Sequence, residues 1–257
     1  MADAFFEPRS ATTFVPTPHA RGPWNDAHLH GGPPAALLAR ALEQHAPTGF
    51  RIVRITYELL RPVPFAELET HVEVDERGKN VRRARATLVS GGKPLLEARA
   101  VLFAEEDVAL PPLPDEAPPP SPDGVAAYTF PFFRNAVGYH TAIELRYARG
   151  RFGESPVLAW IRMRVPLLAD ETPSPLVRVV VAADSGNGVS PRLDTDTHTF
   201  VNPDLGVHLF RPARGEWIGL EAHSTIGERS VGLADTRLWD AEGPVGRGTQ
   251  SLLVRAR

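Results

Sequence analysis

The sequence predicts an α+β fold made of two similar halves, each with a helix followed by antiparallel strands. One helical segment and four strand-like segments occur twice in the same order. Matching points lie about 150 residues apart, as Arg61-Pro62 and Arg211-Pro212 do. A proline-rich segment, residues 107–123, separates the copies. Because proline lacks the amide donor of a strand and breaks helices, we expect an extended linker between a first domain, 1–106, and a second, 124–257.

The composition excludes several functional classes. The chain has 257 residues, a formal net charge of −3 and no cysteine. Without a basic excess to neutralise a phosphate backbone, nucleic-acid binding is not expected. Without cysteine, a thiol nucleophile, an iron–sulfur cluster and a disulfide framework are excluded. No apolar run approaches the roughly 20 residues that span a bilayer, and the first ten residues do not form a secretory signal, so a cytoplasmic protein without a membrane span is expected.

The first half contains one helix and four strand-like runs. Residues 31–45 (GGPPAALLARALEQH) place proline near the helix start and repeat apolar residues at helical spacing. Alternating or apolar runs follow at 51–60, 67–74, 80–89 and 94–104, with turn residues between them. A long helix followed by four antiparallel strands predicts a sheet that wraps around the helix.

The second half repeats this order. Residues 175–184 (PLVRVVVAAD) are a helix candidate with prolines at its start, although the valine-rich middle would suit a strand equally well. Strand-like runs follow at 197–210, 217–224, 230–239 and 246–254. Two such units can pair their sheets edge to edge.

Several short motifs occur in a fixed order along both halves. They are HGGP at 30–33, LLRP at 59–62, Asp184, NPDL at 202–205, FRP at 210–212, EW at 216–217 and QSL at 250–252. This ordered set resembles the double-hotdog acyl-CoA thioesterases of the TesB-like group, particularly an actinobacterial-type branch. The resemblance covers nearly the whole chain.

The resemblance implies a double hotdog, in which two helix-plus-antiparallel-sheet repeats form one continuous sheet. It also implies a hydrolase of lipid metabolism that releases a free acid and CoA from acyl-CoA without a metal or organic cofactor. Such enzymes usually orient a water with Asp, Thr and Gln in the second repeat. Aligned on the Arg-Pro step, Asp184 and Gln250 take two of these positions, and Asn202 falls where the family has threonine.

The residues themselves permit direct attack of water on a thioester. With no cysteine and no GxSxG turn, a carboxylate base with polar groups that hold the water is the economical alternative. Asp184, at the end of an apolar run, would be partly desolvated, but it could also be a turn residue. Gln250 could orient water or satisfy a neighbouring backbone group. Asn202 could share that task or form a plain Asn-Pro turn.

The segment before the first helix is the predicted substrate-binding element. Gly31 and Gly32 would let a substrate oxygen approach the backbone, and the free amides of the first helical turn could form an oxyanion hole, although a tight loop would need the same glycines. His30 belongs to this element, and Trp24 is expected to line an acyl tunnel. His28 and His30 alternate as a metal pair would, but suitably spaced further ligands are missing, so no metal is expected.

Two other functions and two further expectations accompany this interpretation. The first rival is a hotdog enoyl-CoA hydratase, whose D-x-N-P-x-H segment has no matching histidine in residues 200–204. The second is a non-catalytic acyl-CoA-binding protein.

Glu43 lies opposite Asp184 in the repeat but lacks a partner amide, so one working site per chain is expected. We also expect a homo-oligomer, a dimer or larger.

Overall fold

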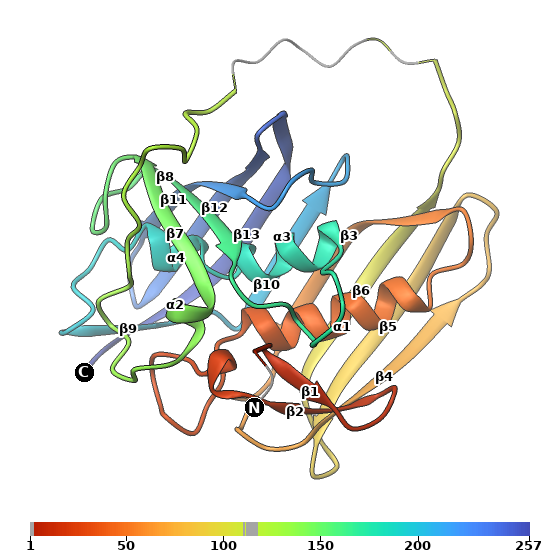
Figure 1. Ribbon diagram of the computed structural model, residues 1–257, viewed down its shortest axis with the longest axis horizontal. Coiled ribbons are helices and arrows are strands. Elements are labelled where there is room, and N and C mark those ends of the chain that lie inside the picture. Colours follow the sequence, from red (N-terminus) through yellow and green to blue (C-terminus); the bar gives the residue numbers. More distant parts are fainter. Residues whose placement is uncertain (1–2, 110, 112–117) are drawn as a thin grey trace.

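A single curved sheet contains strands from both halves of the chain (Figure 1). The computed structural model describes residues 3–109, 111 and 118–257, and within them the sheet has 13 strands. Its order is β1 (Phe6–Pro8), β2 (Thr13–Pro16), β4 (Leu68–Asp75), β5 (Val81–Ser90), β6 (Lys93–Ala104), β3 (Phe50–Leu59), β10 (Asp204–Leu209), β13 (Gly243–Ala256), β12 (Val231–Asp240), β11 (Ile218–Ile226), β8 (Val157–Met163) and β7 (Ile143–Arg149), with β9 (His198–Val201) paired to β13.

The two halves join where β3 pairs with β10 in antiparallel register, with Ile55 opposite Val207. All the ladders between named strands are antiparallel as well. The predicted edge-to-edge pairing into one continuous sheet is therefore confirmed.

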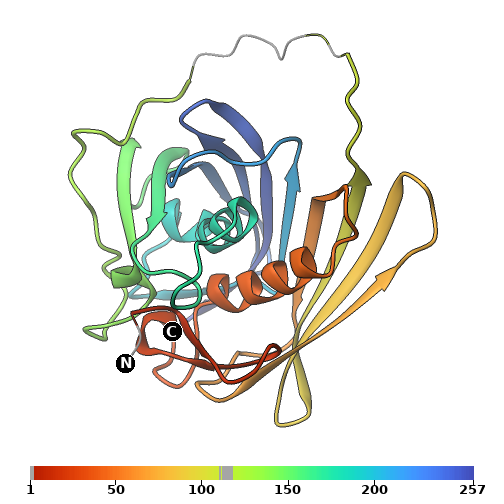
Figure 2. The ribbon, with the colours of Figure 1, turned by 45° about the vertical axis from the view of Figure 1, so that its right-hand side comes forward.

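Two helices lie beside each other on the inner side of the sheet (Figure 2). They are α1 (Gly32–Gln44) and α3 (Pro175–Ala183). The valine-rich run is helical because it is enclosed on all sides: Val179, Val180 and Val181 are fully buried, and such surroundings suit a helix that is apolar all round. Ser174 caps its start by accepting a hydrogen bond from the Val177 N–H. The short helices are η1 (Pro18–Ala20), α2 (Tyr139–Ala142) and α4 (Gly186–Val189).

The duplication extends further than the sequence predicted. A strand pair precedes each main helix, β1–β2 before α1 and β7–β8 before α3, and neither pair was expected. β1 and β2 are short and contain proline, whereas β8 is a buried apolar run without alternation.

The linker was predicted over residues 107–123, and part of it lies outside the described residues. No helix in the described part of the chain is long and apolar enough to cross a membrane.

The strand predicted at 197–210 is wrong as a single strand. It breaks at Asn202-Pro203 into β9 and β10, and both pieces pair with β13. Val201 opposes Leu253 whereas Gly206 opposes Thr249, so the register changes by one residue at the break. Such an irregularity redirects the side chain that it carries.

The repeated Arg-Pro step ties each half to its last hairpin. Arg61 donates to the Pro94 carbonyl at 2.7 Å, and Arg211 donates to the Gly243 carbonyl at 2.9 Å. In the second half only, Arg211 also pairs with the fully buried carboxylate of Asp240, at 2.5 and 2.7 Å. Burial would raise the pKa of Asp240, but hydrogen bonds from Arg211 and from the Arg214 and Glu242 amides outweigh burial and hold it below its usual range.

We expect Asp240→Asn to lower the free energy of unfolding at pH 7 by about 2–4 kcal/mol, because it leaves Arg211 without its charged partner. A lowered carboxyl pKa contributes stability above the unfolded pKa of about 3.9, and that contribution is lost as the pH falls through the folded pKa. Denaturant unfolding between pH 7 and pH 2 should show this acid-dependent loss in the native protein and a weaker one in Asp240→Asn. Glu242→Gln, in the same hairpin but on the surface, is the control and should cost less than about 1 kcal/mol.

Candidate active site

The first turn of α1 and the last turn of α3 meet at close range. A Cβ atom at Gly31 would lie 2.9 Å from Asp184 Oδ2, and one at Gly32 would lie 2.8 Å from the Val181 carbonyl oxygen. Real Cβ atoms are not found so close to other heavy atoms. Both glycines are therefore required by the approach of α3, which brings a carboxylate of the second half to the helix start of the first.

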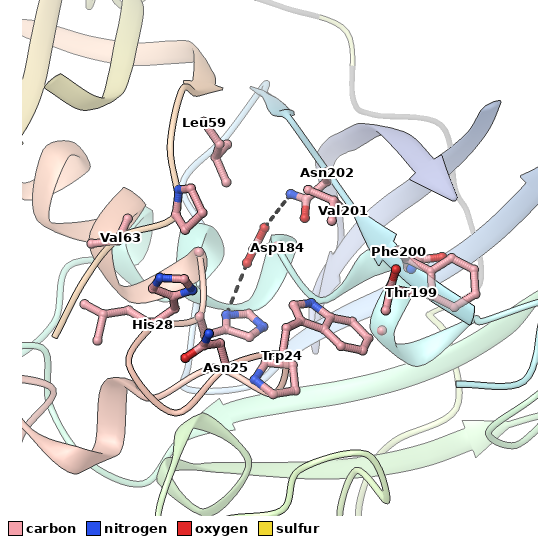
Figure 3. A pocket seen from close by; sticks show the side chains of 18 of the residues that line it. Trp24, Asn25, His28, Leu59, Val63, Asp184, Thr199, Phe200, Val201 and Asn202 are labelled. Atoms are coloured by element: carbon pink, nitrogen blue, oxygen red, sulfur yellow. Dashed lines mark hydrogen bonds and ion pairs between the residues drawn. The ribbon is translucent and has the colours of Figure 1, made fainter. Parts of the chain in front are cut away.

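The Asp184 carboxylate is the centre of this junction. Its Oδ1 accepts from Asn202 Nδ2 at 2.9 Å and from Gln250 Nε2 at 3.3 Å, and its Oδ2 lies 3.1 Å from His30 Nδ1. Figure 3 shows Asp184 between Asn202 and the loop that carries Trp24 and Asn25. The structure thus brings all three residues predicted to be catalytic into contact and adds His30 to them.

Gln250 has both a structural and a site contact. Its Oε1 accepts from the Asn187 amide at 3.2 Å, and its Nε2 donates to the Asp184 carbonyl at 3.1 Å as well as to the carboxylate. With 2% exposure, the side chain needs these partners. The alternative of a bond to neighbouring backbone groups therefore applies, and the same amide also contacts the acid. A role in orienting water stays a prediction.

Asn202 reaches the acid because of the break between β9 and β10. Its Nδ2 donates to Asp184 and, at 3.3 Å, to the Asp204 carbonyl. Its Oδ1 accepts no hydrogen bond from the described residues, and the residue lines the pocket. The amide nitrogen is thus committed to the carboxylate, and the amide oxygen is left as an acceptor in the pocket.

His30 makes two contacts that require different tautomers. Its Nδ1 lies 3.1 Å from Asp184 Oδ2 and 3.1 Å from the Gly32 amide nitrogen. A protonated Nδ1 donates to the carboxylate, whereas an unprotonated Nδ1 accepts from the amide. We assign the proton to Nδ1, because an unprotonated Nδ1 would point its lone pair at the negatively charged carboxylate of Asp184. Burial lowers the pKa of His30 below its ordinary 6.5, against an opposing effect of Asp184, so the ring is neutral at pH 7.

The predicted row of free amides at the start of α1 needs correction. Pro33 and Pro34 have no N–H group, and the Ala35 amide bonds back to the Gly31 carbonyl. The Gly32 amide lies against His30, as described above. With the proton on His30 Nδ1, the Gly32 N–H has no acceptor there, so the N–H groups of Gly31 and Gly32 both lack a partner among the described residues. Of these two residues, Gly31 lines the pocket.

A pocket of about 510 Å³ opens onto these groups. Its apolar wall includes Trp24, which stacks on Phe132 with ring centroids 5.7 Å apart, and two further phenylalanines, Phe130 and Phe133. Trp24 therefore lines a pocket, and its contact with an acyl chain stays a prediction. The phenylalanines were missed, although the aromatic run FPFF at 130–133 was a visible signal in a segment without assigned elements.

No group of three or more metal-binding side chains occurs in the part of the chain that the structure describes. His30 is turned toward Asp184 rather than toward a shared site with His28.

A pH titration followed by nuclear magnetic resonance tests the contact between His30 and Asp184. The pKa of His30 should lie below 6.5 and should fall further in Asp184→Asn, because the substitution removes the carboxylate that stabilises the imidazolium. The signals of His223, exposed on β11, should be the same in both proteins. A pKa of His30 that rises on substitution would contradict the described contact.

Comparison with known proteins gives matches over most of the chain. A family model described as the acyl-CoA thioesterase N-terminal domain matches residues 20–103, and one described as the acyl-CoA thioesterase C-terminal domain matches residues 107–254. No curated protein matches the chain.

Solved structures show the same fold at low sequence identity. The tesB protein of Mycobacterium avium subsp. paratuberculosis is 19% identical, with a TM-score of 0.71 over 97% of this chain and 95% of that chain. An acyl-CoA thioesterase II of Mycobacterium marinum is 14% identical, with a TM-score of 0.70 over 99% and 96%. A hot dog fold protein of Alicyclobacillus acidocaldarius is 15% identical, with a TM-score of 0.76 over 100% and 97%.

These structural likenesses confirm the predicted double-hotdog architecture. The two domain models match in their expected order, one on each half, and the C-terminal one alone covers more than half of the sequence. On these grounds, the chain belongs to the acyl-CoA thioesterase family.

Proposed function

We propose that this thioester hydrolase cleaves acyl-CoA by direct attack of a water molecule that Asp184 activates, with Asn202 and Gln250 holding the carboxylate. The observation that carries the proposal is the convergence of these three side chains, drawn from α3, β13 and the break after β9, at one end of an apolar pocket. A base needs this kind of fixed geometry before its acidity matters.

The attacking water would be held by two acceptors. Asp184 accepts one of its protons, and the free Oδ1 of Asn202 accepts the other. The water oxygen adds to the carbonyl carbon of the thioester while one proton passes to the carboxylate. Collapse of the tetrahedral intermediate breaks the carbon–sulfur bond, and the same proton returns to the departing CoA thiolate. An amide therefore does here what the family's threonine hydroxyl is expected to do.

The oxyanion that develops on the substrate carbonyl needs a hydrogen-bond donor, and the Gly31 N–H is the proposed donor. This N–H lacks a partner among the described residues, and Gly31 lines the pocket at the start of α1, where the aligned peptide dipoles favour negative charge. The glycine that the approach of α3 requires thus also brings an unpartnered backbone donor to the pocket lining.

The substrate's acyl group would occupy the aromatic part of the pocket. The wall formed by Trp24 and the 130–133 segment is apolar, which suits a hydrocarbon chain rather than a charged one. Acyl-CoA is therefore the proposed partner of this site. A homo-oligomer of two or more copies stays a prediction.

Replacing Asp184 by asparagine tests the proposal. The swap keeps the shape of the side chain but removes the base, so kcat should fall by roughly 10²–10⁴-fold. The measurement is the appearance of free thiol from acyl-CoAs of several chain lengths. Asp235→Asn, on the outer sheet face beside Arg247, is the matched control and should retain native activity. Near-native hydrolysis by Asp184→Asn would refute the assignment, and binding without thiol release by the native protein would favour an acyl-CoA-binding protein.

A second candidate, hydration of 2-enoyl-CoA, is favoured by one specific contact. The sequence lacks a histidine in the 200–204 segment, yet His30 of the other half lies 3.1 Å from Asp184. A neutral histidine beside a carboxylate can transfer protons in an addition to a double bond. Loss of the enoyl absorbance without release of thiol would identify this activity instead of hydrolysis.

The other half of the duplication supports a single site per chain. Glu43 is the counterpart of Asp184, but its Oε2 accepts from Ser174 Oγ at 2.5 Å, and the strand position that matches Gln250 is Ala100. An acid without a water-orienting amide is a poor base.

We therefore expect Glu43→Gln to keep kcat within about twofold of the native value. Titration with a tight acyl-CoA analogue should give one equivalent per chain. Two equivalents, with half the activity lost in Glu43→Gln, would mean that both positions work.

A further inference from the structure

Tyr139 is a fully buried residue that neither the family alignment nor the proposed reaction uses. It begins α2, and its amide donates to the Arg21 carbonyl at 3.0 Å, which ties it to the chain that leads into His30. The residue therefore sits beside the site on a fixed backbone.

The ring of Tyr139 lies flat against the imidazole of His30. The ring centroids are 3.7 Å apart and the planes differ by 4°. Phe5 and Phe133 pack around the tyrosine, with centroids 6.3 and 6.5 Å away. A ring held in this way restricts rotation of the imidazole, whose Nδ1 must point at Asp184.

The hydroxyl of Tyr139 contacts the other member of the pair through the end of α3. It donates to the Val181 carbonyl at 2.8 Å and lies 2.8 Å from Ser185 Oγ, which can donate to it in return. The Ser185 amide bonds to Ala182, which leaves the Val181 carbonyl without its usual helical donor. The phenol supplies the missing donor at the turn that carries Asp184.

Tyr139 thus contacts both members of the His30–Asp184 pair, one directly and one through its neighbours. One face of its ring packs on His30, and its hydroxyl bonds to Val181 and Ser185, on either side of Asp184. Burial raises the pKa of Tyr139 above its usual value, so the phenol stays protonated and acts as a hydrogen-bond group rather than a base.

We propose that Tyr139 is a positioning residue: it orients His30, whose Nδ1 contacts Asp184, and it fixes the helix end that carries Asp184. Through the position of the Asp184 carboxylate it sets the rate of the hydrolytic step. The proposal rests on the proposed function for its kinetic part. The His30–Asp184 geometry that it explains is independent of the substrate.

Two variants separate the ring from the hydroxyl. Tyr139→Phe keeps the stack and removes the bond to the Val181 carbonyl, and kcat should fall about 3–10-fold. Tyr139→Leu removes both, and kcat should fall about 10²-fold with KM within about threefold of native, because a small misplacement of a catalytic group costs rate rather than binding.

Tyr147→Phe is the matched control. Tyr147 also donates its hydroxyl to a helical carbonyl, that of Val189 at 2.9 Å, but it contacts neither His30 nor the Asp184 turn. It should lose stability to a similar degree as Tyr139→Phe while keeping native kcat.

The ¹⁵N shifts of the His30 ring give a readout that does not need turnover. The native protein should show a protonated Nδ1, and Tyr139→Leu should shift the proton toward Nε2. If the native protein releases no thiol, the proposed hydrolysis fails, while these shifts still decide the role of Tyr139. Unchanged shifts in a folded Tyr139→Leu, or an equal loss of kcat in Tyr147→Phe, would overturn the proposal.

Discussion

The contact between the first turn of α1 and the last turn of α3 is the constraint on which the rest of the structure depends. Two helices from different halves lie on the concave side of one sheet (Figure 2). Their ends approach so closely that there is no room for a side chain at positions 31 and 32, where both residues are glycine. This approach places a buried carboxylate beside a backbone amide and an imidazole. The sheet, the pairing of β3 with β10 and the aromatic wall all hold this junction in place.

The two halves share an architecture but differ in what fills the matching position. In register, Tyr57 takes the place of Val207, and Ala100 takes the place of Gln250. A bulky ring thus occupies the space on one side, and a polar amide faces the acid on the other. Burial raises the pKa of Glu43 above its usual value, which fits an acid closed off by packing rather than one held ionised by donors. The two halves thus provide two matching helix ends, of which the one at Asp184 lines the pocket and the one at Glu43 does not.

Much of the fold follows from local pattern, whereas the site depends on contacts between distant segments. Repeated spacing, turn residues and the position of proline suffice to predict α1 and the two sets of strands that join, whereas the valine-rich segment of α3 suited a strand equally well. Short strands with proline, such as β1 and β2, have only three and four residues, too few for an alternating pattern to be recognised in the sequence. Asp184 and Gln250 could be found by alignment, but the turn of His30 toward the acid and the stack on Tyr139 bring together residues more than a hundred positions apart. The aromatic run at 130–133 is visible in the sequence, but only the folded structure shows that it lines a pocket.

The most direct test is a crystal structure with an acyl-CoA analogue in which a methylene group replaces the thioester sulfur. This substitution keeps the carbonyl and prevents hydrolysis. The carbonyl oxygen should lie within hydrogen-bond distance of the Gly31 N–H, with Asp184 in reach of the carbonyl carbon through one water and the acyl chain against Trp24. An analogue seated instead in the groove on the outer sheet face, between Phe103 and Phe210, with the inner pocket empty, would contradict the account.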